Sequence, residues 1–444
     1  MTRLFGTDGV RGVANQDLTP DLALALGRAA GEVLAPNGEG VVVGRDTRIS
    51  GPMLEGALAA GLSSAGAGVR LAGVIPTPAV AFLTIHEGAA AGAMISASHN
   101  PVPDNGIKFF SPDGMKLSEG LEDRIEAAME RGPSELPTGL YVGATEWIEE
   151  AHDRYVGHLL ATLPERLIGL RIVLDCAFGS AWKVGPRAFR EAGADVVAIN
   201  AEPDGARINV DCGSTSLDGL AKRVLEEGAD LGLGFDGDAD RVLAVDERGA
   251  VLDGDRILTV LAQGLHEAGQ LKEDVVVATV MSNLGFLRAM RDRGIDVVTA
   301  PVGDKYVVEE MVARGAVLGG EQSGHVILAE HSSTGDGILT GLQLAAFLVA
   351  SDRPLSEISR GWQTFPQVLV NVPVEGRVQL EGAEPLWAEV RAVEAELGDD
   401  GRVLLRASGT EPVVRVMVEA ESEGRARAAA ERLAGAVAVH LDKP

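Results

Sequence analysis

Short apolar runs alternate with longer segments of helical periodicity along most of the chain. Leu22–Leu34 has the spacing of an amphipathic helix, with Thr19 in the N-cap position and Pro20 in the first helical position. A further helix is expected over Glu149–Leu163. The runs typical of buried strands are Val41–Gly44, Val69–Ile75, Ala93–Ser96, Arg171–Asp175, Asp195–Asn200, Asp230–Phe235, Val275–Val280 and Asp296–Ala300. This alternation predicts α/β units built on mostly parallel strands.

Shifts in composition divide the chain into four regions. The dividing segments are the Pro/Gly-rich stretch Gly132–Gly139, the polar turn Asp246–Gly249 and the segment Gly361–Pro366. The last region has a different pattern, with strands expected at Gln367–Val374, Arg402–Arg406 and Val413–Glu419 and helices at Pro385–Leu397 and Glu423–Leu441. We therefore predict three α/β domains of similar size, over residues 1–148, 149–248 and 249–363, and a smaller C-terminal α+β domain over 364–444.

Composition and charge limit the classes of partner. The 444 residues are 46% hydrophobic and 23% charged, which is ordinary for a soluble globular protein. A formal net charge of −26 repels nucleic acid and anionic membranes, so neither is expected as a partner. No run of about 18 apolar residues and no apolar leader segment is visible, so we expect a cytoplasmic protein without a membrane span. Cys176 and Cys212 lie outside any CxxC spacing and are expected to be reduced, buried thiols.

Three carboxylates follow one of the predicted strands at alternate positions, Asp236, Asp238 and Asp240. Carboxylates that face one point repel one another unless a cation is present, and a hard divalent ion such as Mg²⁺ accepts oxygen ligands. A calcium loop is disfavoured because Arg241 stands where its turn needs Gly. A dinucleotide-binding loop is disfavoured because a strand, rather than a helix, is expected to follow. A solvated acidic turn remains the alternative to a metal site.

A second loop, Ile95–Pro101, also follows a predicted strand. Pro101 keeps the residue before it out of the helical region, so the loop can present the hydroxyl of Ser98 in a fixed direction. A serine nucleophile needs a base or a metal-assisted leaving group, and the G-x-S-x-G elbow of a hydrolase triad is missing. An ordinary Ser/Asn turn, and a surface position for Lys108, are the alternatives from the residues alone.

Three further segments carry groups that suit a phosphorylated sugar. Arg406–Pro412, together with Arg415, combines two guanidinium groups with a Ser-Gly-Thr turn, a combination suited to phosphate. Gly319–His325 offers a carboxylate and a hydroxyl to sugar hydroxyls, and Phe5–Gly12 adds a guanidinium group in a Gly-rich loop. Each segment alone is compatible with an ordinary turn.

Four motifs, in this order along the chain, resemble those of the α-D-phosphohexomutase superfamily. They are Ser98–Pro101 (SHNP), Asp236–Arg241 (DGDADR), Gly320–Gly324 (GEQSG) and Arg406–Pro412 (RASGTEP). The resemblance covers essentially the whole chain. It implies an α/β fold of three related α/β domains plus a smaller C-terminal α+β domain around a central cleft.

Four segments most resemble the bacterial branch of the superfamily that acts on glucosamine phosphates. They are Phe5–Gly12, Gly44–Gly51, Ile95–Pro101 and Gly319–His325. The resemblance implies an isomerase that converts glucosamine 6-phosphate reversibly to glucosamine 1-phosphate, through a phosphoserine enzyme and a glucosamine 1,6-bisphosphate intermediate. This reaction would feed the synthesis of UDP-N-acetylglucosamine, a peptidoglycan precursor. The implied partner is a small phosphosugar, with glucosamine or glucose 1,6-bisphosphate as activator, and a homodimer is left open.

The resemblance also implies a role for particular residues. Ser98 would carry the phosphoryl group, and one Mg²⁺ per chain would be bound by Asp236, Asp238, Asp240 and a phosphoserine oxygen. Catalytic roles fall to Arg11 and Lys108 as general acid and base candidates, to Arg241 on the transferred phosphate and to His99 beside the nucleophile. The sugar hydroxyls would meet Glu321 and Ser323, and the other phosphate would be held by Arg406, Ser408, Gly409, Thr410 and Arg415.

Departures from the family pattern and rival functions stand beside this interpretation. Lys305 stands where the glucosamine branch usually has Arg, and Phe178 where the family often has Asn. A mutase of mannose or glucose phosphates is disfavoured by Asp304 and by the Glu-Gln-Ser of the GEQSG motif. An inert sugar-phosphate-binding protein is disfavoured because the serine, the three aspartates and Lys108 occur together. A Mg²⁺-dependent phosphatase, which would release inorganic phosphate, is the third rival.

Overall fold

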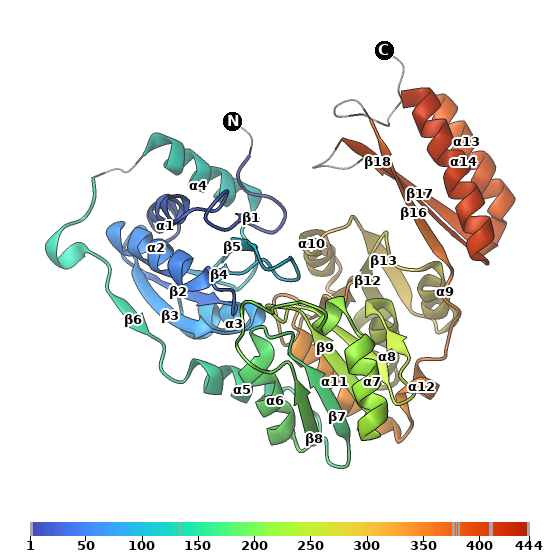
Figure 1. Ribbon diagram of the computed structural model, residues 1–444, viewed down its shortest axis with the longest axis horizontal. Helices are drawn as coiled ribbons and strands as arrows, with labels where there is room; N and C mark the ends of the chain where they lie inside the picture. The colour runs from blue at the N-terminus through green and yellow to red at the C-terminus, as the bar shows by residue number, and fades with distance from the viewer. Residues whose placement is uncertain are drawn as a thin grey trace. The chain divides into compact units, whose positions relative to one another are not determined.

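The structure is a computed structural model that describes residues 3–132, 135–374, 378, 380, 382–407 and 412–441 (Figure 1). The chain forms two compact units, one of residues 1–279 with 298–359 and the other of residues 280–297 with 360–444. Three sheets and their helices make up most of the first unit, and a fourth sheet belongs to the second. Within the described part of the chain, no helix is both long enough and apolar enough to cross a membrane.

The first sheet has six strands in the order β1-β5-β4-β2-β3-β6. Their bounds, in that order, are Val10–Val13, Asp104–Phe110, Ala91–Ile95, Gly40–Arg45, Gly68–Val74 and Thr145–Trp147. Three helices share a core with one face of this sheet, α1 (Pro20–Leu34), α2 (Gly51–Ser64) and α4 (Glu119–Arg131). The opposite face of β2 and β4 packs against α3 (Thr77–His86), so these central strands are buried on both sides.

The second and third sheets have the orders β11-β10-β9-β7-β8 and β13-β12-β14-β15. The strands of the second are Val251–Leu252, Val242–Asp246, Leu231–Phe235, Arg171–Asp175 and Asp195–Ile199. Those of the third are Asp296–Ala300, Val275–Thr279, Leu318–Gly320 and Val326–Leu328. The helices around them are α5 (Ala151–Ala161), α6 (Ala181–Ala192), α7 (Asp218–Glu227), α8 (Gly254–Glu267), α10 (Asp304–Arg314), α11 (Gly337–Ser351) and α12 (Leu355–Ile358). Single 3₁₀ turns occur at Gly139–Tyr141, Gly213–Thr215, Lys272–Asp274 and Gly398–Asp400.

The three sheets repeat one strand order, which relates the three α/β domains. Neighbouring strands run β3-β2-β4-β5 in the first sheet, β8-β7-β9-β10 in the second and β13-β12-β14-β15 in the third. Counted in chain order within each set of four, the first strand lies between the second and the third. The fourth strand pairs antiparallel with the third. The expectation of mostly parallel strands therefore holds for the sheet centres, and each sheet ends in an antiparallel edge because only a short connection precedes its fourth strand.

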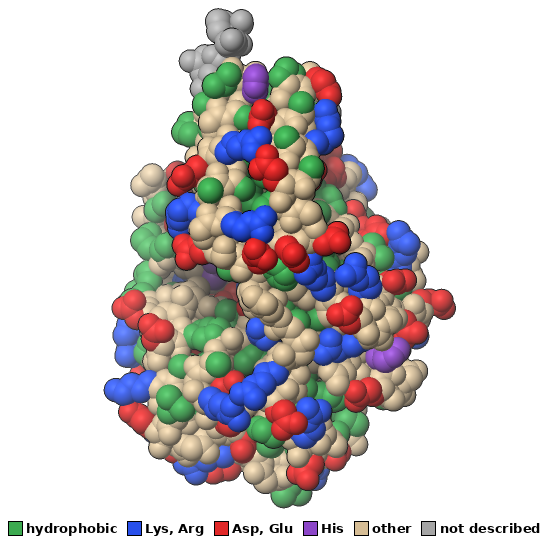
Figure 2. All heavy atoms as spheres, turned by 90° about the vertical axis from the view of Figure 1, so that its right-hand side faces the viewer, with side chains coloured by type: hydrophobic (Ala, Val, Ile, Leu, Met, Phe, Trp, Pro, Cys, Tyr) green, Lys and Arg blue, Asp and Glu red, His purple; other side chains and the backbone are tan. Residues whose placement is uncertain are grey.

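The second unit is an α+β domain with an antiparallel sheet in the order β16-β18-β17. Its strands are Gln367–Pro373, Val413–Ala420 and Gly401–Ala407, and α13 (Glu384–Leu397) and α14 (Glu423–Leu441) share its apolar core. On the outer face of these two helices, acidic and basic side chains are interspersed (Figure 2), and Arg432 pairs there with Glu389 and Glu396.

A segment of residues 280–297 also belongs to the second unit, including α9 (Leu284–Asp292). The buried carboxylate of Glu419 on β18 accepts hydrogen bonds from the Asn283 side chain and the Leu284 backbone, and Arg402 Nε donates to it at 2.6 Å. Asn283 also bonds the backbone of Phe365 in both directions. These bonds explain why a segment between two strands of the third sheet packs with the C-terminal domain.

Several local predictions are confirmed. The helix α1 begins at Pro20, and the Thr19 side chain accepts a hydrogen bond from the backbone of Leu22. The expected helices over 149–163, 385–397 and 423–441 appear as α5, α13 and α14 with shifts of two residues or fewer at either end. Cys176 and Cys212 are free and buried. The domain boundaries at residues 148, 248 and 363 remain predictions.

Candidate active site

Three of the motifs occupy equivalent positions in the three α/β domains. The serine loop joins β4 to β5, the aspartate loop joins β9 to β10, and the loop with Glu321 and Ser323 joins β14 to β15. Each loop therefore leaves the carboxyl end of the third strand of its sheet, where ligands bind in open α/β sheets. The repeated topology explains why chemistry-bearing residues recur at wide intervals along the chain.

Ser98 is buried, and its backbone lies in the left-handed region with φ of 52°. Its Oγ donates a hydrogen bond to Asp236 Oδ2 at 2.5 Å and lies 3.4 Å from His99 Nδ1. Its backbone N–H donates to Ser96 Oγ at 2.9 Å. Left-handed backbone is uncommon outside Gly and Asn, so the conformation of Ser98 depends on the groups around it. The nucleophile predicted from sequence thus faces the predicted metal ligands.

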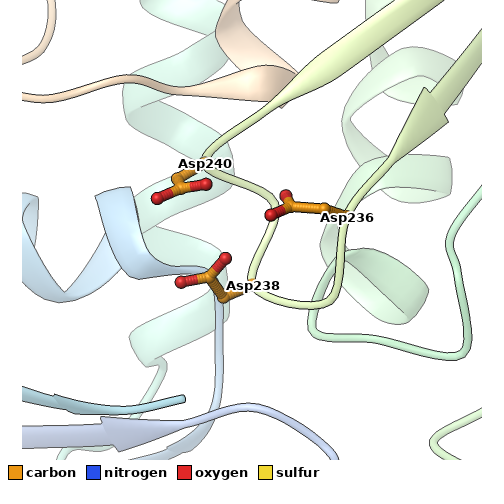
Figure 3. A group of neighbouring side chains, drawn as sticks. All are labelled: Asp236, Asp238 and Asp240. Atoms are coloured by element: carbon orange, nitrogen blue, oxygen red, sulfur yellow. The ribbon is translucent and has the colours of Figure 1, made fainter. Parts of the chain in front are cut away.

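The aspartate loop brings three buried carboxylates together (Figure 3). One oxygen from each of Asp236, Asp238 and Asp240 lies within 4.8 Å of the others. Ala239, with φ of 56°, turns the chain so that the alternate side chains converge. Among the described residues, Asp238 Oδ1 and Asp240 Oδ1 are buried with no hydrogen-bond partner. Two unpaired buried carboxylate oxygens in a cluster of three fit a hard divalent cation.

The electrostatics of the cluster agree with that fit. Burial, with the carboxylates of Asp240 and Asp238 next in importance, raises the pKa of Asp236 well above its ordinary value. Burial would likewise raise the pKa of Asp240, but Lys108 and His325 lower it well below the ordinary value. The carboxylates of Asp238 and Asp240 therefore oppose the ionisation of Asp236, and a cation that bound all three would remove this repulsion.

Lys108 on β5 is buried against the same carboxylates. Its Nζ donates to Asp238 Oδ2 at 3.0 Å and to Asp240 Oδ2 at 3.4 Å. Burial would lower the pKa of Lys108, but Asp238 and Asp240 outweigh burial and raise it. The surface position that a single Lys suggests is therefore wrong, and this ammonium is held in its charged form beside the acidic cluster.

Two guanidinium groups approach the serine loop from other elements. Arg11 on β1 lies 3.4 Å from Asn100 Oδ1 and 3.5 Å from Asp8. Burial would lower the pKa of Arg241, but Asp240 and Asp236 raise it. Burial, together with Arg241 and Arg11, lowers the pKa of His99. In the described part of the chain, Arg11 Nε and Arg241 Nε are buried donors without a hydrogen-bond acceptor, which suits an anion beside Ser98.

The loop that carries Glu321 and Ser323 is held by a hydrogen bond within the third domain. Glu321 Oε1 accepts from the backbone N–H of Gly303 at 3.2 Å, and Ser323 Oγ lies 3.5 Å from Glu321 Oε2. Glu321 also contributes to the raised pKa of Arg241, so this loop faces the aspartate loop. The carboxylate and hydroxyl predicted for sugar recognition therefore lie on the same side of the first unit as the aspartate cluster.

A charged network that sequence reasoning did not assign links this loop to the first domain. His325 lies 3.7 Å from Asp240 and 3.6 Å from Asp304. Lys116 bridges Asp304 at 2.6 Å and Asp8 at 2.9 Å. Burial would lower the pKa of His325, but Asp240 and Asp304 raise it. The signal was present in the glycine-flanked segments that contain these residues, although their pairing depends on tertiary structure.

A buried ion pair behind the serine loop was also missed. Asp46 and Arg48, which follow β2, are both fully buried, and Arg48 Nε lies 3.0 Å from Asp46 Oδ2. Since β2 and β4 are parallel neighbours, the residues that follow them meet at one edge of the sheet. That rule, applied to Asp46 and to the serine loop after β4, was the available signal.

The predicted phosphate-binding residues of the C-terminal domain are described in part. Arg406 on β17 and Arg415 on β18 are directly opposite each other in the antiparallel ladder. Burial and then Arg415 lower the pKa of Arg406. Like charges opposite each other are unfavourable, so this pair suits an anion. Ser408, Gly409 and Thr410 lie outside the described residues.

The structure shows the surroundings of the two departures from the family pattern. Phe178 has φ of 53°, a conformation that Asn adopts more readily than Phe, and the Arg207 guanidinium lies 4.0 Å from the centroid of its ring. Lys305 Nζ pairs with Glu119 at 2.8 Å at the surface.

Comparison with known proteins defines the class. Four models of phosphoglucomutase/phosphomannomutase match in order: alpha/beta/alpha domain I at residues 2–135, alpha/beta/alpha domain II at 153–249, alpha/beta/alpha domain III at 253–365 and the C-terminal domain at 369–436. The chain belongs to the phosphoglucomutase/phosphomannomutase family. It is 55% identical over 443 residues to the phosphoglucosamine mutase of Rhodococcus opacus (strain B4), covering 99% of this chain and 100% of that protein.

Solved structures share the fold. A phosphoglucomutase/phosphomannomutase family protein from Burkholderia thailandensis superposes with a TM-score of 0.82 at 26% identity, over 99% of this chain and 98% of that one. The N-acetylphosphoglucosamine mutase of Aspergillus fumigatus, solved in complex with GlcNAc-6P and magnesium, gives a TM-score of 0.71 at 20% identity over 99% of this chain and 96% of that one. At that identity the likeness to the fungal protein is one of fold.

Proposed function

We propose that this chain is an isomerase that interconverts glucosamine 6-phosphate and glucosamine 1-phosphate, with Ser98 as the carrier of the transferred phosphoryl group. The observation that carries the proposal is the hydrogen bond from Ser98 Oγ to Asp236 within a buried carboxylate cluster. The choice of substrate is supported by the full-length relative at 55% identity that is named phosphoglucosamine mutase.

The proposed reaction moves one phosphoryl group twice. In the first half, the bond between phosphorus and Ser98 Oγ breaks while a bond forms from phosphorus to the free hydroxyl oxygen of the sugar phosphate. Ser98 Oγ gains one proton and the sugar hydroxyl loses one, so the acid and base groups end with the protons with which they began. The product is a 1,6-bisphosphate. After this molecule has turned end for end, its other phosphoryl group returns to Ser98. Such transfers depend mainly on positioning and on neutralisation of charge.

Asp236, Asp238 and Asp240 would hold Mg²⁺, since the unpaired oxygens of Asp238 and Asp240 and the raised pKa of Asp236 beside them fit a hard divalent cation. When bound, such an ion withdraws charge from a phosphoryl group. The protein groups around it have separate tasks. Arg241 and Arg11 would pair with phosphoryl oxygens, because both present unused buried N–H donors.

Proton transfer would fall to Lys108 and Arg11. Because its pKa is raised, Lys108 enters the cycle as an ammonium. It would therefore first stabilise negative charge and donate a proton, rather than accept one. His99, beside Ser98 Oγ and with a lowered pKa, stays neutral near pH 7 and orients the hydroxyl. Glu321 and Ser323 would bind sugar hydroxyls, and Arg406, Arg415, Ser408, Gly409 and Thr410 would hold the phosphate that is not being transferred.

The test is isomerisation of glucosamine 6-phosphate in the presence of Mg²⁺, with glucose 6-phosphate and mannose 6-phosphate assayed in parallel and catalytic glucose 1,6-bisphosphate supplied. We expect a clear preference for the amino sugar. Equal or better use of the neutral sugars would keep the mutase chemistry but overturn the substrate. Release of inorganic phosphate instead of an isomer would indicate a phosphatase, and no reaction with any sugar would favour an inert binding protein.

A further inference from the structure

The backbone of Ser98 is enclosed by hydrogen bonds from groups outside the proposed catalytic set. Four side chains take part, Asp46, Arg48, Ser96 and Asn209. We infer that Arg48 and Asn209 are positioning residues that hold the Ser98 carbonyl, and thereby the left-handed serine, in the orientation required for phosphoryl transfer. The inference rests on the proposed function of Ser98.

Arg48 makes the first half of the enclosure. Its Nη2 donates to the carbonyl oxygens of Ser98 at 3.0 Å and Asn100 at 2.8 Å, and its Nη1 donates to those of Pro101 at 2.6 Å and Asp104 at 2.9 Å. One guanidinium group therefore fixes three carbonyls of the serine loop and the first carbonyl of β5. Only the planar fork of Arg can do this, because the single ammonium of Lys cannot reach all four.

Asp46 and Ser96 connect this guanidinium group back to Ser98. Asp46 Oδ2 accepts from Arg48 Nε at 3.0 Å and from Ser96 Oγ at 2.7 Å. Ser96 Oγ in turn accepts from the Ser98 N–H at 2.9 Å. The side chains of Ser96, Asp46 and Arg48 thus link the N–H of Ser98 to its carbonyl oxygen through a closed ring of hydrogen bonds. Ser98 and these three residues are all buried, so the bonds of the ring are well shielded from water.

Asn209 makes the second half of the enclosure, and it comes from the second domain. Its Nδ2 donates to the Ser98 carbonyl at 2.8 Å and lies 3.4 Å from that of Asn100. These are two of the carbonyls that Arg48 contacts. The loop that carries Asn209 fits closely on the first domain, because a Cβ on Gly205 would lie 2.2 Å from the Thr47 carbonyl oxygen.

The space around the Ser98 carbonyl leaves little freedom for another arrangement. A Cβ on Gly237, between the first two aspartates, would lie 2.7 Å from that carbonyl oxygen and 3.0 Å from Asn209 Nδ2. Non-Gly residues in left-handed backbone store strain, which surrounding contacts must offset. Loss of one donor should therefore let the Ser98 backbone relax and turn Oγ away from Asp236, while the sugar-binding residues keep their places.

The experiment compares Asn209→Gly with the matched control Asn200→Gly. Both asparagines are left-handed, with φ of 60° and 49°, and both donate a side-chain hydrogen bond, but Asn200 donates to Asp175 and not to the serine loop. Glycine removes the side chain without backbone strain. We expect Asn209→Gly to lower kcat and the rate of Ser98 phosphorylation by glucose 1,6-bisphosphate about 10-fold or more, with KM within about 2-fold. Asn200→Gly should change neither rate by more than about 2-fold.

Hydrogen exchange measured by mass spectrometry gives a readout that does not need activity. The peptide with the serine loop should exchange faster in Asn209→Gly than in the parent protein, and not in Asn200→Gly. Arg48→Lys, which cannot contact all four carbonyls, should resemble Asn209→Gly in both readouts. Unchanged kcat and exchange in Asn209→Gly would overturn the inference, as would an equal loss in both Asn variants. If the parent protein isomerises no sugar but the serine-loop peptide still exchanges faster in Asn209→Gly than in the parent, the proposed function is refuted and the structural role of Asn209 is kept.

Discussion

The hydroxyl of Ser98 donates a hydrogen bond to Asp236 at 2.5 Å, although 138 positions separate the two residues in the chain. The two loops belong to different domains and occupy the same place in each domain's sheet, after its third strand. The proposed nucleophile and the acidic cluster therefore meet through a repeated topology. This contact makes several consequences measurable.

The carboxylate cluster should make stability depend on Mg²⁺. An ion that binds only the folded state raises the free energy of unfolding, by about 2.7 kcal/mol at a hundred times its Kd. We expect Mg²⁺ to raise the thermal midpoint of the parent protein and to have little effect on Asp238→Asn. In EDTA, Asp236→Asn should be at least as stable as the parent, because it removes a carboxylate whose ionisation its neighbours oppose. Equal Mg²⁺ shifts in parent and Asp238→Asn would contradict a site at this cluster.

The opposed arginines of the C-terminal domain should govern affinity for the sugar phosphate. Arg415→Gln removes a charge-assisted donor, which corresponds to a loss of about 10- to 100-fold in affinity. We expect KM for glucosamine 6-phosphate to rise by that factor. Arg425→Gln is a suitable control, because Arg425 pairs at the surface of the same unit with Glu421. If both variants keep the KM of the parent, Arg415 does not hold the substrate.

Asp336 should make stability fall as the pH rises through the mildly acidic range. Burial raises its pKa from 3.8 to about 6, although it caps α11 through Leu339 N and accepts from Tyr155 Oη at 2.8 Å. The folded state therefore binds this proton more tightly than the unfolded state. Its contribution to the free energy of unfolding, roughly 2–3 kcal/mol, is present below about pH 4 and is lost as the pH rises through about 6.

Urea denaturation of the parent and Asp336→Asn at several pH values measures this contribution. Asn keeps the capping group but does not titrate, so the stability difference should change in favour of the variant between about pH 4 and pH 6. Tyr155→Phe removes a hydrogen bond that lowers the pKa of Asp336, and should extend the change to higher pH. A pH-independent difference would show that Asp336 titrates normally in the fold.

Glu419 should hold the segment 280–297 on the C-terminal domain. Glu419→Gln leaves Arg402 without its ionic partner and weakens the bonds to Asn283 and Leu284, so we expect a loss of about 2–4 kcal/mol in the free energy of unfolding. Limited proteolysis should then cut within the segment faster. Glu421→Gln, which removes only an exposed ion pair with Arg425, should change stability far less. Similar losses in the two variants would argue against this role for Glu419.

Much of the fold could be predicted because local signals and tertiary structure agree. Thr19 and Pro20 define the start of α1, and the apolar runs give the central strands of each sheet. The antiparallel strands at the sheet edges could not be predicted in the same way. An apolar run such as β10 shows burial, but its direction depends on the length and course of the connection that precedes it.

The residues of the candidate site also differ in whether a local signal in the sequence could identify them. The carboxylates at 236, 238 and 240 were found because they recur at alternate positions after one predicted strand. The role of Ser98 was predicted from the resemblance of its loop to a family motif. Arg48 was missed because a single Arg is normally exposed, and it is buried here only since Asp46 and four carbonyl groups satisfy it. Asn209 gives no local signal, because its partner lies in another domain.

The most direct test of the central claim is to locate the phosphoryl group. The protein is incubated with Mg²⁺ and glucose 1,6-bisphosphate, analysed by intact mass and peptide mapping, and then mixed with glucosamine 6-phosphate. We predict one phosphoryl group, at Ser98, that is lost on mixing as fast as the isomer forms, and no phosphorylation or turnover in Ser98→Ala. A phosphoryl group on another residue, or turnover in Ser98→Ala close to that of the parent, would contradict the account.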